Sequence, residues 1–173
     1  MQATARRLFV ASATSCARRR LTRNALPQHP MPLDQPLVDA AIRQALDRFP
    51  TGYAGAAAVR TDAGRIITSV AFDPPNSCAS LCHEAGAYCE ANRIGARVVA
   101  SVCVSRETPG GTFIILAPCG ICQERLALWG PDVEVAVAVL GRPGEWECRT
   151  LAELRPHDWL RAVSDAEQSP ILR

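Results

Sequence analysis

The chain contains no lysine, so arginine and three histidines are the only basic side chains. There are 19 Arg against 17 Asp and Glu in 173 residues, which gives a formal net charge of +2. Segment 1–30 carries six of the arginines and no acidic residue, so the rest of the chain is formally −4. A nucleic-acid-binding domain needs a clustered basic face. We therefore expect no nucleic-acid partner.

Long apolar runs are also absent. The run LFVASA at 8–13 is too short to span a membrane, and no later segment approaches the ~20 apolar residues of a transmembrane helix. No convincing secretory signal is present. We expect a soluble, cytoplasmic protein with no membrane partner.

Cysteine, by contrast, is abundant for this length. The eight cysteines stand at positions 16, 78, 82, 89, 103, 119, 122 and 148. Without a secretory signal a disulfide framework is not expected, so metal binding or catalysis explains them better. Two of them, Cys89 and Cys103, are interpreted as core residues of a helix and a strand.

The length suits one domain with a full core. We assign that domain to residues 31–173 and expect 1–30 to be a basic, disordered N-terminal extension. Such an Arg-rich, acid-free segment resembles an organelle targeting peptide, or it reflects a start codon placed too early. The second interpretation is favoured because the sequence from Met31 looks like an ordinary start to a first helix.

Apolar periodicity and turn residues predict the elements of this domain. Helices are expected at about 35–48, from Ser80 to Gly95, at about 120–129, and within 156–166. A β-hairpin is expected around 61–64, and further strands at 96–105, 112–117, 133–140 and in the segment that follows. The alternation of helices and strands predicts an α/β fold, with a mixed sheet of about five strands flanked by helices.

The segment PCGIC places Cys119 and Cys122 at the start of a predicted helix. A helix N-terminus stabilises thiolates, but two thiolates do not complete a zinc site. Cys82, at the start of the other internal helix, is the expected third ligand. Three protein ligands and one open position are typical of catalytic zinc. Glu84, about 200° further round that helix, would reach a group bound beside the metal as general acid/base.

Other interpretations of these cysteines remain open. Three buried thiols without chemistry are one. A closed structural zinc site is another, with His83, Cys78 or Cys89 as the fourth ligand. A Cys119–Cys122 redox couple is a third, although a thioredoxin-like context is missing.

The segments LCHE and PCGIC resemble the paired motifs of the zinc-dependent cytidine deaminase family, (Cys or His)-x-Glu and Pro-Cys-x-x-Cys. The resemblance covers about residues 37–160. It implies a cytidine-deaminase-like three-layer sandwich with one Zn²⁺ per subunit on Cys82, Cys119 and Cys122. It also implies that Glu84 carries protons between water, the ring nitrogen and the departing ammonia. The family further implies a homotetramer, or a dimer, and a role in pyrimidine salvage.

The substrate pocket departs from the family pattern. Ala71 and Asp73 occupy the positions of the family's nucleoside-binding Asn-x-Glu, and Gly52 occupies that of a pocket phenylalanine, with Tyr53 beside it. Tyr53 also matches the spacing of an aromatic residue in the blasticidin S deaminases.

The arginines that follow the family's zinc motifs are also missing. Ala85 and Gln123 stand in their places. The positive charge that offsets the thiolates is therefore expected to come from Arg125 or from a helix dipole.

We expect Asp73, Tyr53, His83 and Trp159 to contact the substrate, the last as a lid in the segment ELRPHDW. The predicted function is hydrolytic deamination of cytidine or deoxycytidine to uridine or deoxyuridine, with release of ammonia. Alternatives are a deaminase of another aminated heterocycle, of blasticidin S type or acting on an aminopyrimidine or purine, and a non-catalytic zinc-binding protein.

Overall fold

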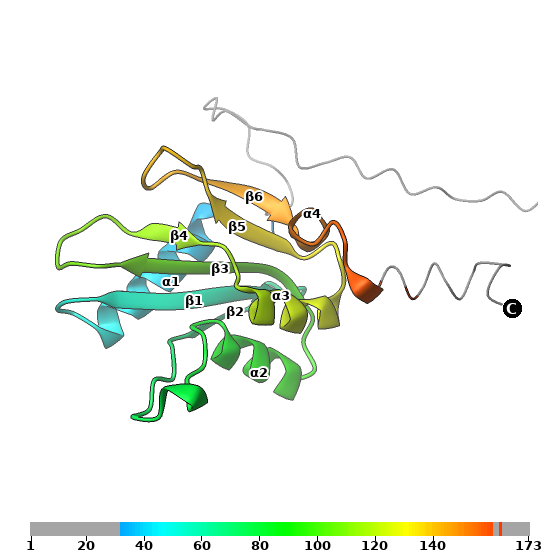
Figure 1. Cartoon of the computed structure of the whole chain (residues 1–173), viewed down its shortest axis with the longest axis horizontal. Coiled ribbons are helices and arrows are strands. Elements are labelled where there is room, and N and C mark those ends of the chain that lie inside the picture. The colour runs from blue at the N-terminus through cyan, green and yellow to red at the C-terminus, as the bar shows by residue number, and fades with distance from the viewer. Residues whose placement is uncertain (1–31, 161–162, 164–173) are drawn as a thin grey trace, which may run out of the picture.

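One mixed β-sheet forms the centre of the molecule (Figure 1). The computed structural model describes residues 32–160 and 163. Five strands run in the order β2-β1-β3-β5-β6, and the short β4 pairs with β3. All neighbours are antiparallel except β3 and β5. The strands are β1 (Ala54–Thr61), β2 (Ile66–Ser69), β3 (Val98–Arg106), β4 (Ile114–Leu116), β5 (Glu134–Ala138) and β6 (Trp146–Thr150).

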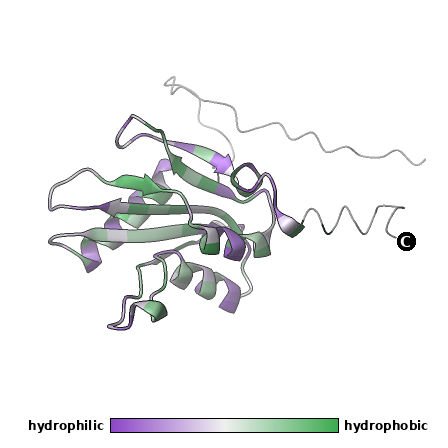
Figure 2. Cartoon of the chain, in the orientation of Figure 1, coloured by the Kyte–Doolittle hydropathy of each residue, from purple (hydrophilic) through white to green (hydrophobic). Residues whose placement is uncertain are grey.

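Helices cover both faces of this sheet, which makes three layers. Helix α1 packs on one face, and α2 and α3 pack on the other (Figure 1). The helices are α1 (Gln35–Arg48), α2 (Ala85–Arg93), α3 (Gly120–Leu126) and α4 (Leu151–Leu154), with 3-10 turns η1 (Ser77–Ala79) and η2 (Ala127–Trp129). The hydropathy colouring shows polar residues mainly on the outer sides of the helices (Figure 2). None of the helices in the described part of the chain is long and apolar enough to cross a membrane.

The predicted fold class and element order are confirmed, with β4 as a sixth strand. Helix α1 has the predicted bounds, and β1 and β2 form the predicted hairpin. The predicted extension 1–30 lies outside the described residues, as does part of the predicted last helix at 156–166. Helix α4, which was not predicted, precedes that segment and starts in a capping box formed by Thr150 and Glu153.

The predicted start of α2 at Ser80 is wrong, because the helix begins at Ala85. Leu81 pairs with Phe72 in an isolated antiparallel bridge, with backbone hydrogen bonds in both directions. This pairing keeps the chain extended up to Leu81. Cys82 therefore lies in the entry to α2 and not in its first turn, so the angle expected between Cys82 and Glu84 on one helix does not apply.

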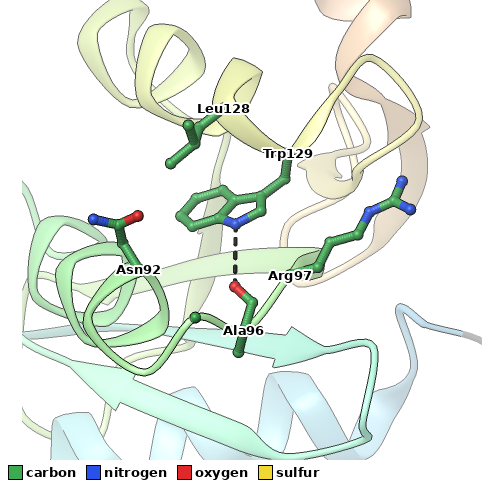
Figure 3. Close-up of a pocket in the computed structure, with 6 residues that line it drawn as sticks. Asn92, Ala96, Arg97, Leu128 and Trp129 are labelled. Atoms are coloured by element: carbon green, nitrogen blue, oxygen red, sulfur yellow. Dashed lines mark hydrogen bonds between the residues drawn. The ribbon is translucent and has the colours of Figure 1, made fainter.

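Tryptophan 129 connects η2 to the end of α2 on the same face of the sheet. Its indole Nε1 donates a hydrogen bond to the carbonyl oxygen of Ala96 at 3.1 Å (Figure 3). Its ring also meets the Tyr88 ring edge to face, with centroids 5.9 Å apart. An aromatic contact of this kind holds the ends of α2 and α3 together.

Helix α1 is attached to the sheet through its N-cap. Asp34 accepts a hydrogen bond from the Leu37 backbone N–H at 3.0 Å, and its carboxylate also contacts the Arg60 guanidinium of β1. Arg60 donates a second hydrogen bond to the Pro32 carbonyl at 2.9 Å. One carboxylate thus caps the helix and pairs it with the sheet.

Replacing Asp34 by Ala removes both interactions. We expect Asp34→Ala to lower the free energy of unfolding by about 1–2 kcal/mol, measured by urea denaturation. Asp47→Ala is the matched control, because Asp47 is exposed near the end of the same helix. It should change the value by less than about 0.5 kcal/mol. Equal losses in the two variants would contradict the role assigned to the cap.

Candidate active site

Three cysteines from two separate segments meet beside the sheet face covered by α2 and α3. Cys82 lies just before α2, Cys119 is the N-cap of α3, and Cys122 lies in the first turn of α3. Their sulfur atoms all lie within 4.8 Å of one another, and the Cys82 and Cys119 sulfurs are 3.4 Å apart. Thiolates around tetrahedral zinc are separated by about 3.8 Å. The predicted cluster is therefore present, and its spacing fits a metal ion.

The surroundings of the three thiols favour a bound cation. Burial raises the pKa of Cys122, and the nearby charge of Glu84 raises it further. Burial and the hydrogen bond with Cys119 raise the pKa of Cys82. Burial also opposes ionisation of Cys119, but hydrogen bonds of its sulfur with the Cys122 backbone N–H and with Cys82 favour it, and the net effect lowers the pKa of Cys119. Three ionised thiols together therefore need a positive charge between them.

Glu84 lies next to this cluster at the N-terminal end of α2. It is 4% exposed, and it occupies the N-cap position without a side-chain capping bond. Its carboxylate oxygen lies within 4.8 Å of the Cys103 sulfur, and its charge raises the pKa values of Cys82, Cys122 and Cys103. A buried carboxylate beside a metal site can exchange protons with a group bound there.

The side chains of His83 and Tyr53 contact each other above Gly55 of strand β1, beside Glu84. The Tyr53 hydroxyl lies 3.2 Å from His83 Nε2. Burial lowers the pKa of His83, against the opposing effect of the Glu84 charge, so the imidazole is neutral at neutral pH. A Cβ on Gly55 would lie 2.4 Å from His83 Nε2 and 2.8 Å from the Tyr53 hydroxyl. The absence of a side chain at Gly55 thus makes room for the pair.

Ser69, which was not predicted as a site residue, anchors this segment to β2. Its hydroxyl donates to the His83 carbonyl at 2.5 Å and accepts from the Ala87 backbone N–H at 3.0 Å. Gly86 permits the close approach, since a Cβ there would lie 2.9 Å from the Ser69 Cβ. No local sequence signal identifies Ser69, because its partners lie 14 and 18 residues further along the chain.

Cys103 was predicted as a strand core residue, and it is buried. The structure adds that its sulfur lies within 4.8 Å of a His83 ring nitrogen and a Glu84 carboxylate oxygen. The prediction that Cys89 is a core residue is wrong, because Cys89 is exposed. Helix α2 buries Ala87, Tyr88 and Ala91, so the intervening Cys89 lies on its outer side.

The other predicted substrate contacts lie in exposed segments. Asp73 accepts a hydrogen bond from the Ser80 hydroxyl at 2.8 Å. Trp159 is 57% exposed, and its indole nitrogen donates to Glu124 of α3 at 3.3 Å. Their roles toward a substrate stay predictions.

Among the described residues, neither Gln123 nor Arg125 takes over the role of the missing arginines by donating a side-chain hydrogen bond to the three thiols. Gln123 donates from its side chain to the Pro118 carbonyl at 2.8 Å. Arg125 has a buried Nη1 without a hydrogen-bond partner among the described residues. The N-terminus of α3, where Cys119 is the cap, remains as a source of positive potential.

A separate pocket lies between the end of α2 and η2 (Figure 3). Its lining residues are Asn92, Gly95, Ala96, Arg97, Leu128 and Trp129. None of the predicted site residues is among them. We therefore place the candidate active site at the thiol cluster.

Comparison with solved structures identifies similar proteins. No protein-family model and no curated protein matches the chain. The crystal structure of the cytidine deaminase from Bacillus anthracis is 39% identical to it, with a TM-score of 0.71. The match covers 76% of this chain and 92% of that one.

Two further bacterial structures agree with this match. The cytidine deaminase from Mycobacterium tuberculosis is 25% identical, with a TM-score of 0.53, over 73% of this chain and 98% of that one. The cytidine deaminase from Burkholderia pseudomallei is 21% identical, with a TM-score of 0.58, over 73% and 99%. The last match supports the fold alone.

Replacing one thiol should remove the metal. We expect Cys82→Ser to lower the metal content of the purified protein from one equivalent to less than about 0.1, because the cluster offers three ligands and loses one. Inductively coupled plasma mass spectrometry measures the content. Cys89→Ser is the matched control and should keep one equivalent, since Cys89 is exposed on the outer side of α2. Full metal content in Cys82→Ser would contradict the assignment.

Proposed function

The chain belongs to the cytidine deaminase family, and we propose that it hydrolyses cytidine or deoxycytidine to uridine or deoxyuridine with release of ammonia. The observation that carries the proposal is the cluster of three cysteines with the buried Glu84 beside it. Three ligands leave a coordination position open, and an adjacent carboxylate that is not a ligand can serve as general acid/base.

Zinc is the metal that this donor set suits best. Cys82, Cys119 and Cys122 offer three soft sulfur ligands, which select zinc over hard cations such as Mg²⁺ or Ca²⁺. When bound, zinc lowers the pKa of a coordinated water toward ~7 and so supplies a nucleophile at neutral pH. We expect one Zn²⁺ per subunit.

Glu84 carries the protons in the proposed reaction. Its carboxylate accepts a proton from the attacking water and delivers it to the ring nitrogen next to the aminated carbon. It then transfers the second water proton to the departing amino group. A C–O bond forms, the exocyclic C–N bond breaks, and ammonia leaves. The burial of Glu84 excludes bulk water from these transfers.

Four residues are proposed to contact the substrate. Tyr53 and His83 form a hydrogen-bonded pair beside Glu84 and would line the side of the base pocket. Asp73 would accept a hydrogen bond from a sugar hydroxyl. Trp159, which is largely exposed, would act as a lid.

The wider biological setting belongs to the same proposal. We infer that residues 31–173 act as one deaminase domain, and that it assembles as a homotetramer or dimer. Cys82, Cys119 and Cys122 are not in disulfides, and a reducing compartment such as the cytoplasm preserves thiols in this state. A role in pyrimidine salvage follows from the proposed substrate.

A deaminase of another aminated heterocycle is the second candidate. The observation that favours it is the engagement of Asp73 by the Ser80 hydroxyl, together with Ala71, whose side chain forms no hydrogen bonds. A sugar would therefore have few partners at these two positions. Glu84 argues against a non-catalytic zinc protein, because burying a carboxylate has a cost that catalysis explains.

Replacing the acid/base residue tests the reaction. We expect Glu84→Gln to lower kcat for ammonia release from cytidine by roughly 10²- to 10⁴-fold, with zinc content unchanged. Glu90→Gln is the matched control on α2, because Glu90 pairs with Arg93 at the surface. It should keep the activity of the unaltered protein.

The outcome on cytidine separates the two candidates. If the zinc-loaded protein released no ammonia from cytidine or deoxycytidine, the cytidine assignment would fail. Ammonia release from cytosine, an aminopurine or blasticidin S, lost in Glu84→Gln, would then identify the second candidate. Equal activity of Glu84→Gln and the unaltered protein would contradict the proposed role of Glu84.

A further inference from the structure

A second group of metal-binding side chains lies beside the three-cysteine cluster. One ring nitrogen of His83, a carboxylate oxygen of Glu84 and the sulfur of Cys103 all lie within 4.8 Å of one another. His83 and Glu84 come from the entry to α2, and Cys103 comes from β3. Two distant parts of the chain thus bring a nitrogen, an oxygen and a sulfur donor to one point.

We propose that His83, Glu84 and Cys103 form a second binding site for a divalent zinc-like cation, and that a cation bound there inhibits the enzyme. The binding part stands on the geometry of the three residues. The inhibition rests on the proposed function, because it assumes that Glu84 carries protons.

The donor set suits zinc and cadmium better than hard cations. Imidazole nitrogen, carboxylate oxygen and thiolate sulfur are the three ligand types that zinc uses in proteins. Glu84 and Cys103 are each 4% exposed, so their donor atoms face the interior. Buried donors that lie close together lose little conformational entropy when a metal binds.

The imidazole of His83 is held in place before any metal arrives. The missing side chain at Gly55 gives the ring its space on β1, and the Tyr53 hydroxyl lies 3.2 Å from Nε2. A histidine that binds a metal through one nitrogen commonly donates its other N–H to a nearby oxygen. With Nδ1 on the metal, Nε2–H would donate to the Tyr53 oxygen.

The local charge also favours a second cation. Three thiolates and one Zn²⁺ leave a formal charge of −1, and the Glu84 carboxylate brings it to −2. A second divalent cation would offset this charge, which acts at short range in a partly buried site.

Binding of the second cation releases one proton and takes one base out of the reaction. The Cys103 thiol releases its proton to solvent and forms a sulfur–metal bond. The Glu84 carboxylate becomes a ligand and no longer accepts a proton from water. Deamination therefore slows at excess metal, although the first metal stays on its three cysteines.

Metal stoichiometry tests the site without using activity. The full-length chain, loaded with one equivalent of zinc, is titrated in a calorimeter with Co²⁺, which binds thiolates more weakly than zinc and leaves the first zinc in place, and the thiolate-to-cobalt absorption is recorded. We expect one further equivalent to bind and one further thiolate signal to appear. Cys103→Ser should lose the signal and weaken this step at least tenfold, and His83→Ala should weaken it similarly, while both keep the first zinc.

Two controls make the result specific. Cys89→Ser, the same substitution at an exposed position of α2, should still bind the further equivalent. Inhibition of ammonia release by excess Zn²⁺ should be at least tenfold weaker in Cys103→Ser than in the unaltered protein. Because the binding step is read by heat and absorption, it remains decisive even if cytidine is not the substrate.

Three results would overturn the proposal. One is an unaltered, zinc-loaded protein that binds no further Co²⁺. Another is a further equivalent that Cys103→Ser and His83→Ala bind as tightly as the unaltered protein. The third, for the inhibitory part alone, is equal inhibition by excess Zn²⁺ in Cys103→Ser and the unaltered active enzyme.

Discussion

The convergence of three cysteine thiols at the ends of two helices is the interaction on which the rest of the structure depends. Cys82 enters α2, while Cys119 and Cys122 begin α3, and the two segments are 37 residues apart in the chain. Both helices must pack on the same face of the sheet for the sulfurs to meet. The shared core of this face, which includes Tyr88 and Leu126, provides that packing. The order of strands between the two segments therefore brings three thiols that could hold one metal ion to the same point.

This geometry is unfavourable without a cation. Burial and neighbouring negative charge raise the pKa values of Cys82 and Cys122, and Glu84 is buried beside them. Like charges in a partly buried site oppose one another, so a metal held by the three thiolates would stabilise this part of the fold. Contacts outside the metal site hold the segment in the same place. Ser69 binds the backbone on both sides of Glu84, and Gly55 leaves space for the ring of His83.

The zinc motifs and the order of elements could be predicted from the sequence because they depend on residues close together in the chain. The start of α2 could not, since the pairing of Phe72 with Leu81 that delays it joins residues of different segments. The exposure of Cys89 was missed because the helix was predicted to start before Cys82. Helix α2 starts only at Ala85, so Cys82 and Cys89 do not share a helix face. Cys103 was correctly placed in the core, but its approach to Glu84 depends on how α2 packs over β3. Contacts between elements carry no signature in local periodicity.

X-ray absorption at the zinc edge tests the central claim most directly. The protein is loaded with one equivalent of zinc. The account predicts three sulfur ligands at about 2.3 Å and one lighter ligand at about 2.0 Å. That result would establish a three-cysteine site with one open position for chemistry. Four sulfur ligands would mean a closed structural site, and fewer than three would mean that Cys82, Cys119 and Cys122 do not share the metal.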